Sequence, residues 1–76
     1  MMQIDREINA RGLNCPLPLM KAKKAMDELG TGQVLKLIAT DSGSMRDVLE
    51  FVTEAGHEML EQNQVGKDYI HIMRHK

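Results

Sequence analysis

The chain contains one cysteine, which stands at the start of the string Cys15-Pro16-Leu17-Pro18. Proline lacks a backbone N–H, so it is tolerated in the first turn of a helix but not in the interior. The two prolines therefore predict that Cys15 lies at the N-terminus of a helix. The positive end of the helix dipole would lower the pKa of a thiol in that position and favour the nucleophilic thiolate. Such a thiolate can accept sulfane sulfur as a persulfide and later give it up.

Charged residues near this motif are candidates for contacts with a substrate or a partner protein. Arg11 and Lys21 flank Cys15 in the sequence and would add positive potential to it. Arg46 and Asp47 begin a second predicted helix, and they would approach Cys15 if both strand-to-helix loops lie at the same end of a sheet. We therefore expect Cys15 to be the catalytic residue, with substrate or partner contacts from Arg11, Pro16, Leu17, Pro18, Lys21, Arg46 and Asp47.

A structural role is the simpler alternative for several of these residues. A free cysteine is among the most buried residue types and usually only packs in a core. Ser44 and Asp47 resemble a capping box at the start of the second helix, with Asp in place of Glu. The lysines that follow the cysteine motif are typical of a solvated helix face. The three histidines show no metal-ligand spacing, so neither a metal nor a cofactor is expected.

The spacing of apolar residues predicts the elements that position the motif. In chain order they are a strand at residues 3–10, a helix from Pro16 to Leu29, a strand at 34–39, a helix whose apolar stripe runs from Met45 to Ala55, and strands at 57–63 and 68–74. Gly30 and Gly56 are placed to end the two helices. The stripe of the second helix comprises Met45, Val48, Leu49, Val52 and Ala55.

The order of these elements is βαβαββ. Each helix has one apolar stripe and the sheet has an apolar face, and packing the helices on the sheet buries both. Because crossovers are right-handed, few topologies remain. We expect an α+β fold, a two-layer α/β sandwich in which two helices pack on one face of a four-stranded mixed sheet. With 76 residues the chain is too short for two cores, so residues 1–76 are expected to form a single domain. Leu, Ile and Val would fill the core together with Met20, Met26, Met45 and Met59.

Charge and hydropathy exclude several classes of protein. The formal net charge is −1 and only Phe51 and Tyr69 are aromatic, so direct binding of nucleic acid is not expected. No apolar run approaches the roughly 20 residues that span a membrane. The first residues, Met1 to Asp5, have neither the basic nor the apolar region of a secretory leader. A lone cysteine in such a chain fits a reducing compartment, so a cytoplasmic location is expected.

The string Arg-Gly-Leu-x-Cys-Pro-x-Pro at residues 11–18 is the most specific motif of the chain. Together with the segments 5–10, 21–25, 39–47, 57–60 and 69–74, it resembles the TusA/SirA-like family of sulfur carriers. The resemblance covers essentially the whole chain. It implies the same βαβαββ sandwich, and it places the family's persulfide site at Cys15. It also implies a sulfurtransferase in the broad sense, which takes sulfur from a cysteine desulfurase or rhodanese-type donor and delivers it to a downstream acceptor protein.

Leu17 departs from the acidic residue that some tRNA-thiolation members of this family carry between the prolines. The resemblance therefore leaves the relay open among tRNA thiolation, sulfur oxidation and general sulfur trafficking. Two other classes of function also stay open on the sequence. One is a regulatory or adaptor module without sulfur chemistry, and the other is a thiol redox sensor that forms mixed disulfides.

Overall fold

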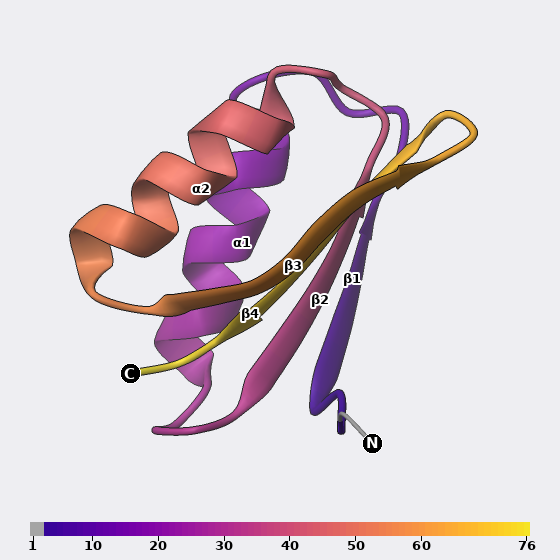
Figure 1. Ribbon diagram of the computed structural model, residues 1–76. Helices are drawn as coiled ribbons and strands as arrows, with labels where there is room; N and C mark the ends of the chain where they lie inside the picture. Colours follow the sequence, from indigo (N-terminus) through magenta and orange to yellow (C-terminus); the bar gives the residue numbers. More distant parts are fainter. Residues whose placement is uncertain (1–2) are drawn as a thin grey trace.

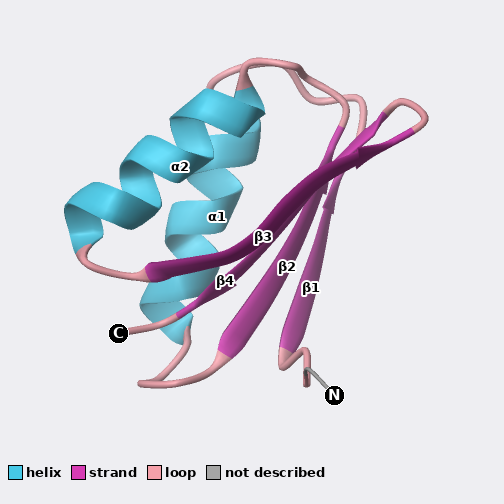
Figure 2. Ribbon diagram, in the orientation of Figure 1, coloured by secondary structure: helices cyan, strands magenta, loops and turns pink. Residues whose placement is uncertain are grey.

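A computed structural model describes residues 3–76, which form a four-stranded sheet with two helices on one of its faces (Figure 1; Figure 2). The expectation that the chain has no secretory leader concerned Met1 to Asp5, and of these Met1 and Met2 lie outside the described residues. In chain order the elements are β1 (Arg6–Ala10), α1 (Leu17–Glu28), β2 (Val34–Ala39), α2 (Ser44–Ala55), β3 (Glu58–Val65) and β4 (Asp68–Arg74). The predicted βαβαββ order and two-layer α/β sandwich are confirmed.

The sheet is mixed, with the strand order β1-β2-β4-β3. β1 and β2 run parallel, from Arg6 opposite Leu35 to Ala10 opposite Ala39. β4 pairs antiparallel with both β2 and β3. Because β1 and β2 are parallel, the loops that leave their carboxyl ends lie at the same edge of the sheet, where they lead into α1 and α2 (Figure 1). This shared edge is the part of the fold that positions the cysteine motif.

The core lies between the sheet and the helices. Side chains alternate along a strand, so β2 turns Leu35, Leu37 and Ala39 towards the helices, and all three are fully buried. From the helices and from β4, the buried residues of the core are Ala22, Ala25, Met26, Val48, Val52 and Met73. The strand predicted at residues 34–39 matches β2, because a central strand reads as a nearly continuous apolar run, broken here only by Lys36.

Two residues that were expected in the core are exposed instead. Met20 is 56 % exposed because it lies on the side of α1 opposite the buried stripe of Pro18, Ala22 and Met26. Leu49 is 43 % exposed because α2 buries Ser44, Val48 and Val52, spaced four residues apart, and Leu49 falls outside that stripe. The remaining predicted stripe residues of α2 are buried or partly buried.

The ends of β1, α1 and β3 differ from the prediction, and β3 runs from Glu58 to Val65 rather than over residues 57–63. β1 begins at Arg6 rather than residue 3, since the Asp5 side chain already accepts the Val34 N–H at 2.7 Å. α1 begins at Leu17 and ends at Glu28, where Leu29 is already extended, so Gly30 does not form a left-handed cap. Gly56 does end α2 in the left-handed conformation that favours glycine. Neither of the two helices within residues 3–76 is long and apolar enough to cross a membrane.

Candidate functional site

Cys15 lies in the loop between β1 and α1, at the edge where the loop between β2 and α2 also begins. Two hydrogen bonds join the loops. The Gly12 N–H donates to Thr40 Oγ1 at 2.8 Å, and the Cys15 N–H donates to Asp41 Oδ2 at 3.1 Å. These contacts hold the backbone of the cysteine in place while its side chain stays exposed.

The two prolines stand where α1 begins, as predicted. Pro16 is the N-cap residue, and Pro18 lies in the first turn with less than 2 % of its surface exposed. Cys15 therefore precedes the cap by one residue, and the Cys15–Pro16 peptide bond is cis. The Leu17 N–H, the first backbone donor of α1, donates to the Asn14 carbonyl at 2.9 Å. The helix N-terminus consequently stabilises a thiolate at Cys15 less than the sequence indicated.

Asp47 is the direct partner of the thiol. Its Oδ2 lies 3.0 Å from Cys15 Sγ, so the thiol donates a hydrogen bond to the carboxylate. This hydrogen bond raises the pKa of Cys15 above its ordinary value, and desolvation and the negative charges of Asp47 and Asp41 act in the same direction. The predicted approach of Asp47 to Cys15 is confirmed. The predicted lowering of the thiol pKa is wrong, because the sulfur contacts the Asp47 carboxylate and not the N–H groups of the helix N-terminus.

Arg11 and Lys21 were expected to add positive potential to the thiol and Arg46 to approach it, but all three lie against other residues. Arg11 forms a two-pronged ion pair with Asp68 at the start of β4, with Nη2 2.8 Å from Oδ2. Arg46 pairs with Glu50 one turn along α2 at 3.0 Å, and its side chain is 85 % exposed. Lys21 lies over β1, in a shallow hollow that Arg6, Ile8, Lys24 and Ala25 also line.

Asp41 is a residue of this site that the sequence analysis did not select. The sequence favoured a loop and helix-cap role for Asp41 over a role in a docking loop near the site, and yet its carboxylate accepts the Cys15 N–H. The signal that could have found it is its place directly after a strand that runs parallel to the strand preceding Cys15. The capping-box interpretation of Ser44 and Asp47 is wrong as well. Gly43 is the N-cap, Ser44 contacts His71, and Asp47 contacts Cys15.

A family model described as Sulfurtransferase TusA matches residues 6–75, from the start of β1 to beyond the end of β4. The chain belongs to the TusA family. The resemblance that the Cys-Pro-x-Pro motif indicated is therefore confirmed for the whole sandwich.

Relatives within and near the TusA family agree with this assignment. The sulfur carrier protein TusA of Allochromatium vinosum is 46 % identical over 66 residues, which cover 87 % of either chain. The putative sulfur carrier protein YrkI of Bacillus subtilis is 43 % identical over 65 residues, covering 86 % of this chain and 87 % of the relative. The crystal structure of a SirA-like protein from Desulfitobacterium hafniense has a TM-score of 0.82 at 25 % identity, and the match covers 91 % of this chain and 95 % of that chain.

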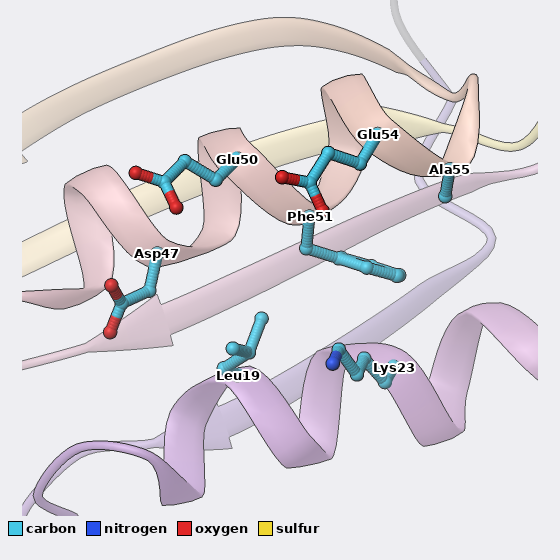
Figure 3. A pocket seen from close by; sticks show the side chains of 7 residues that line it. All are labelled: Leu19, Lys23, Asp47, Glu50, Phe51, Glu54 and Ala55. Atoms are coloured by element: carbon cyan, nitrogen blue, oxygen red, sulfur yellow. The ribbon is translucent and has the colours of Figure 1, made fainter.

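A hollow of about 390 Å³ runs between the two helices of this TusA-family chain and begins at Asp47, beside the sulfur. Figure 3 shows Leu19 and Lys23 on α1 facing Phe51 on α2. The Lys23 ammonium lies 5.7 Å from the centre of the Phe51 ring. Glu50, Glu54 and Ala55 complete the lining on the α2 side. Within residues 3–76, no three acidic, cysteine or histidine side chains are grouped so that they could hold a metal ion.

Proposed function

We propose that this chain is a sulfur carrier that holds sulfane sulfur as a persulfide on Cys15 and passes it to an acceptor protein. Membership of the TusA family and the names of the relatives support a sulfur-carrier role. The observation that carries the choice of residue is the place of Cys15. Its exposed thiol stands at the sheet edge where both strand-to-helix loops meet, in the most specific motif of the chain.

The chemistry of loading and release needs only thiols and a donor persulfide. In loading, the Cys15 thiol loses its proton and the thiolate attacks the outer sulfur of the donor persulfide. A new S–S bond forms at Cys15, the donor's S–S bond breaks, and the donor leaves as a thiolate that takes up a proton. Release repeats the step with an acceptor thiolate attacking the outer sulfur on Cys15. Because the chain has one cysteine, it cannot close an intramolecular disulfide, and the next thiol comes from a partner.

A cysteine desulfurase or a rhodanese-type protein is the donor we propose, and the acceptor is a downstream protein of the sulfur relay. A stand-alone catalytic activity would be weak, because the chain supplies a carrier thiol and no second reactive group. Arg11, Leu17, Lys21 and Arg46 are exposed and can contact these partners. Pro18 cannot, since it is buried in the first turn of α1, and its role is to shape the start of the helix.

Loading by a desulfurase tests this function directly. The chain is incubated with a cysteine desulfurase, its pyridoxal phosphate and isotopically labelled cysteine, and the intact mass is measured without reductant. We expect wild type to gain the mass of one sulfur atom and the label, and Cys15→Ser to gain neither. A Cys15→Ser chain that still carries labelled sulfur would show that another group accepts it.

The competing redox-sensor function finds less support in the geometry. A sensor cysteine reacts with oxidants as a thiolate, whereas the Asp47 carboxylate keeps the Cys15 thiol protonated by raising its pKa. The same mass measurement separates the two functions. A chain isolated without reductant that carries the mass of glutathione rather than of sulfur would favour the sensor.

A further inference from the structure

The charges that face the sulfur of Cys15 are negative. Asp47 on α2 lies against Sγ at 3.0 Å, and Asp41 in the preceding loop holds the Cys15 N–H at 3.1 Å. The helix α2 and the loop before it thus each direct a carboxylate towards Cys15. In a site built only to hold an anionic persulfide, cations would be expected in these positions.

Nearby cations within residues 3–76 do not offset these carboxylates. Arg11, in the loop that carries Cys15, is held by Asp68, and Arg46 is held by Glu50. On α1, Lys21 lies over β1 and Lys23 lies over the ring of Phe51. The charges that act on the thiol are accordingly those of Asp47 and Asp41.

The two states of the carrier interact with Asp47 in opposite ways. The empty thiol has a proton and donates it in a hydrogen bond to the carboxylate. A persulfide is more acidic than the thiol from which it forms, so the loaded group is an anion at neutral pH, without a proton to donate. The carboxylate therefore stabilises the empty state and repels the loaded one.

We propose that Asp47 biases Cys15 towards the unloaded thiol and so makes the chain a ready sulfur donor to its acceptor. The inference rests on the proposed function, since it concerns the loading of the same sulfur. The affected equilibrium is the exchange in which Cys15–SH and a donor persulfide R–S–SH give Cys15–S–SH and R–SH. One S–S bond forms and one breaks, and no net oxidation occurs. Asp41, which accepts the Cys15 N–H, adds a second negative charge near the sulfur.

The exchange equilibrium with a small persulfide tests this proposal. Wild type and Asp47→Asn are equilibrated anaerobically with a fixed ratio of glutathione persulfide to glutathione, and the loaded fraction is read from the intact mass. We expect the ratio of loaded to empty chain to rise about fivefold in Asp47→Asn, the size of one unit-charge contact in a solvated site. The midpoint of the pH profile of Cys15 alkylation should fall in the same variant.

Two further variants control for charge and for position. Glu54→Gln removes one carboxylate from the same helix two turns further on, and it should leave both the loaded fraction and the alkylation profile as in wild type. Asp47→Glu keeps the charge beside the sulfur and should keep the loaded fraction low. Circular dichroism verifies that each variant retains the helices and strands of the wild type.

The outcomes distinguish this inference from the function on which it rests. If wild type takes up no sulfur from either glutathione persulfide or the desulfurase, the sulfur-carrier function fails. If wild type loads and Asp47→Asn loads to the same extent, the function stands and the bias assigned to Asp47 is overturned. An equal rise in Asp47→Asn and Glu54→Gln would also overturn it, because the effect would then belong to net charge rather than to the contact.

Discussion

At the residue scale, one proton shared between Cys15 Sγ and Asp47 Oδ2 determines how the carrier behaves when it is alone. A protonated thiol is a poor nucleophile, so it is protected from adventitious oxidation while it waits for a donor. The thiolate forms as the pH rises through the raised pKa of the thiol. Exposure and low resting reactivity can therefore coexist in one cysteine.

Leu17, two residues after Cys15, offers a second test of the electrostatics around the sulfur. It is the first residue of α1 and is 46 % exposed, so Leu17→Glu adds a carboxylate next to Cys15 without disturbing the core. The added charge should raise the pKa of the thiol further, and the alkylation profile should move to higher pH. Near the helix N-terminus the same charge should change the free energy of unfolding by about 0.3–1 kcal/mol in the stabilising direction.

Leu17→Gln is the matched neutral control, and it should leave the alkylation profile at the wild-type position. Urea unfolding followed by circular dichroism gives the stability of the two variants. An alkylation midpoint that moves to lower pH in Leu17→Glu would contradict this account of the charges around the sulfur.

At the element scale, the N-terminus of α2 is held by a polar cluster of the buried Ser44 and His71 and the partly buried Gln62. The Gln62 amide nitrogen donates to the Met45 carbonyl at 2.8 Å and lies 3.1 Å from His71 Nδ1. Since that nitrogen can only donate, Nδ1 must accept, and the proton of the neutral ring sits on Nε2, which faces Ser44 Oγ at 3.1 Å. The cluster fixes the first turn of the helix that carries Asp47.

His71 should make the free energy of unfolding depend on pH. Burial lowers the pKa of His71 from 6.5 to about 4, and protonation of Nδ1 would also place an N–H against the Gln62 amide. As the pH falls below 6.5, His71 becomes protonated in the unfolded chain, whereas in the folded chain it stays neutral until about pH 4. The free energy of unfolding should therefore fall progressively between pH 6.5 and pH 4, by up to about 3 kcal/mol at pH 4.

Urea unfolding between pH 7 and pH 4, compared in wild type and His71→Gln, measures this contribution. The wild type should lose more stability than the variant across that range, because carboxylate protonation affects both chains alike. An NMR titration of the native protein provides a second measurement. A His71 ring that titrates in the folded state near its ordinary pKa would disprove the assignment, whatever the urea data show.

Elements set by local periodicity could be predicted from the sequence, whereas contacts between distant residues could not. The apolar run of β2 and the alternation of β4 gave the correct strands, because side-chain direction within a strand follows from the sequence alone. Ser44 and Asp47 were misassigned as a capping box because their partners lie 27 and 32 residues away. The raised pKa of Cys15 arises from one of those distant contacts, so the motif that located the thiol could not reveal its charge state.

At the scale of the whole molecule, all the helices and strands within residues 3–76 share one core, and we propose that the chain folds as a single domain. The helices cover one face of the sheet, as Figure 1 shows. On the other face, Ile38 and the partly buried Ile70 and Ile72 lie side by side on the adjacent strands β2 and β4. The two faces should therefore contribute unequally to stability.

Leu37 and Ile72 allow the two faces to be compared. Leu37 is fully buried in the core, and Leu37→Ala should cost about 2–5 kcal/mol, a large part of the stability of so small a domain. Ile72→Thr, on the open face, should cost about 1 kcal/mol. Urea unfolding can be followed by circular dichroism, which reports mainly on the helices, and by the fluorescence of Tyr69, the only tyrosine in a chain without tryptophan. If one core holds both layers together, the two signals must change at the same urea concentration in each variant, and separate transitions would show that the helices and the sheet unfold independently.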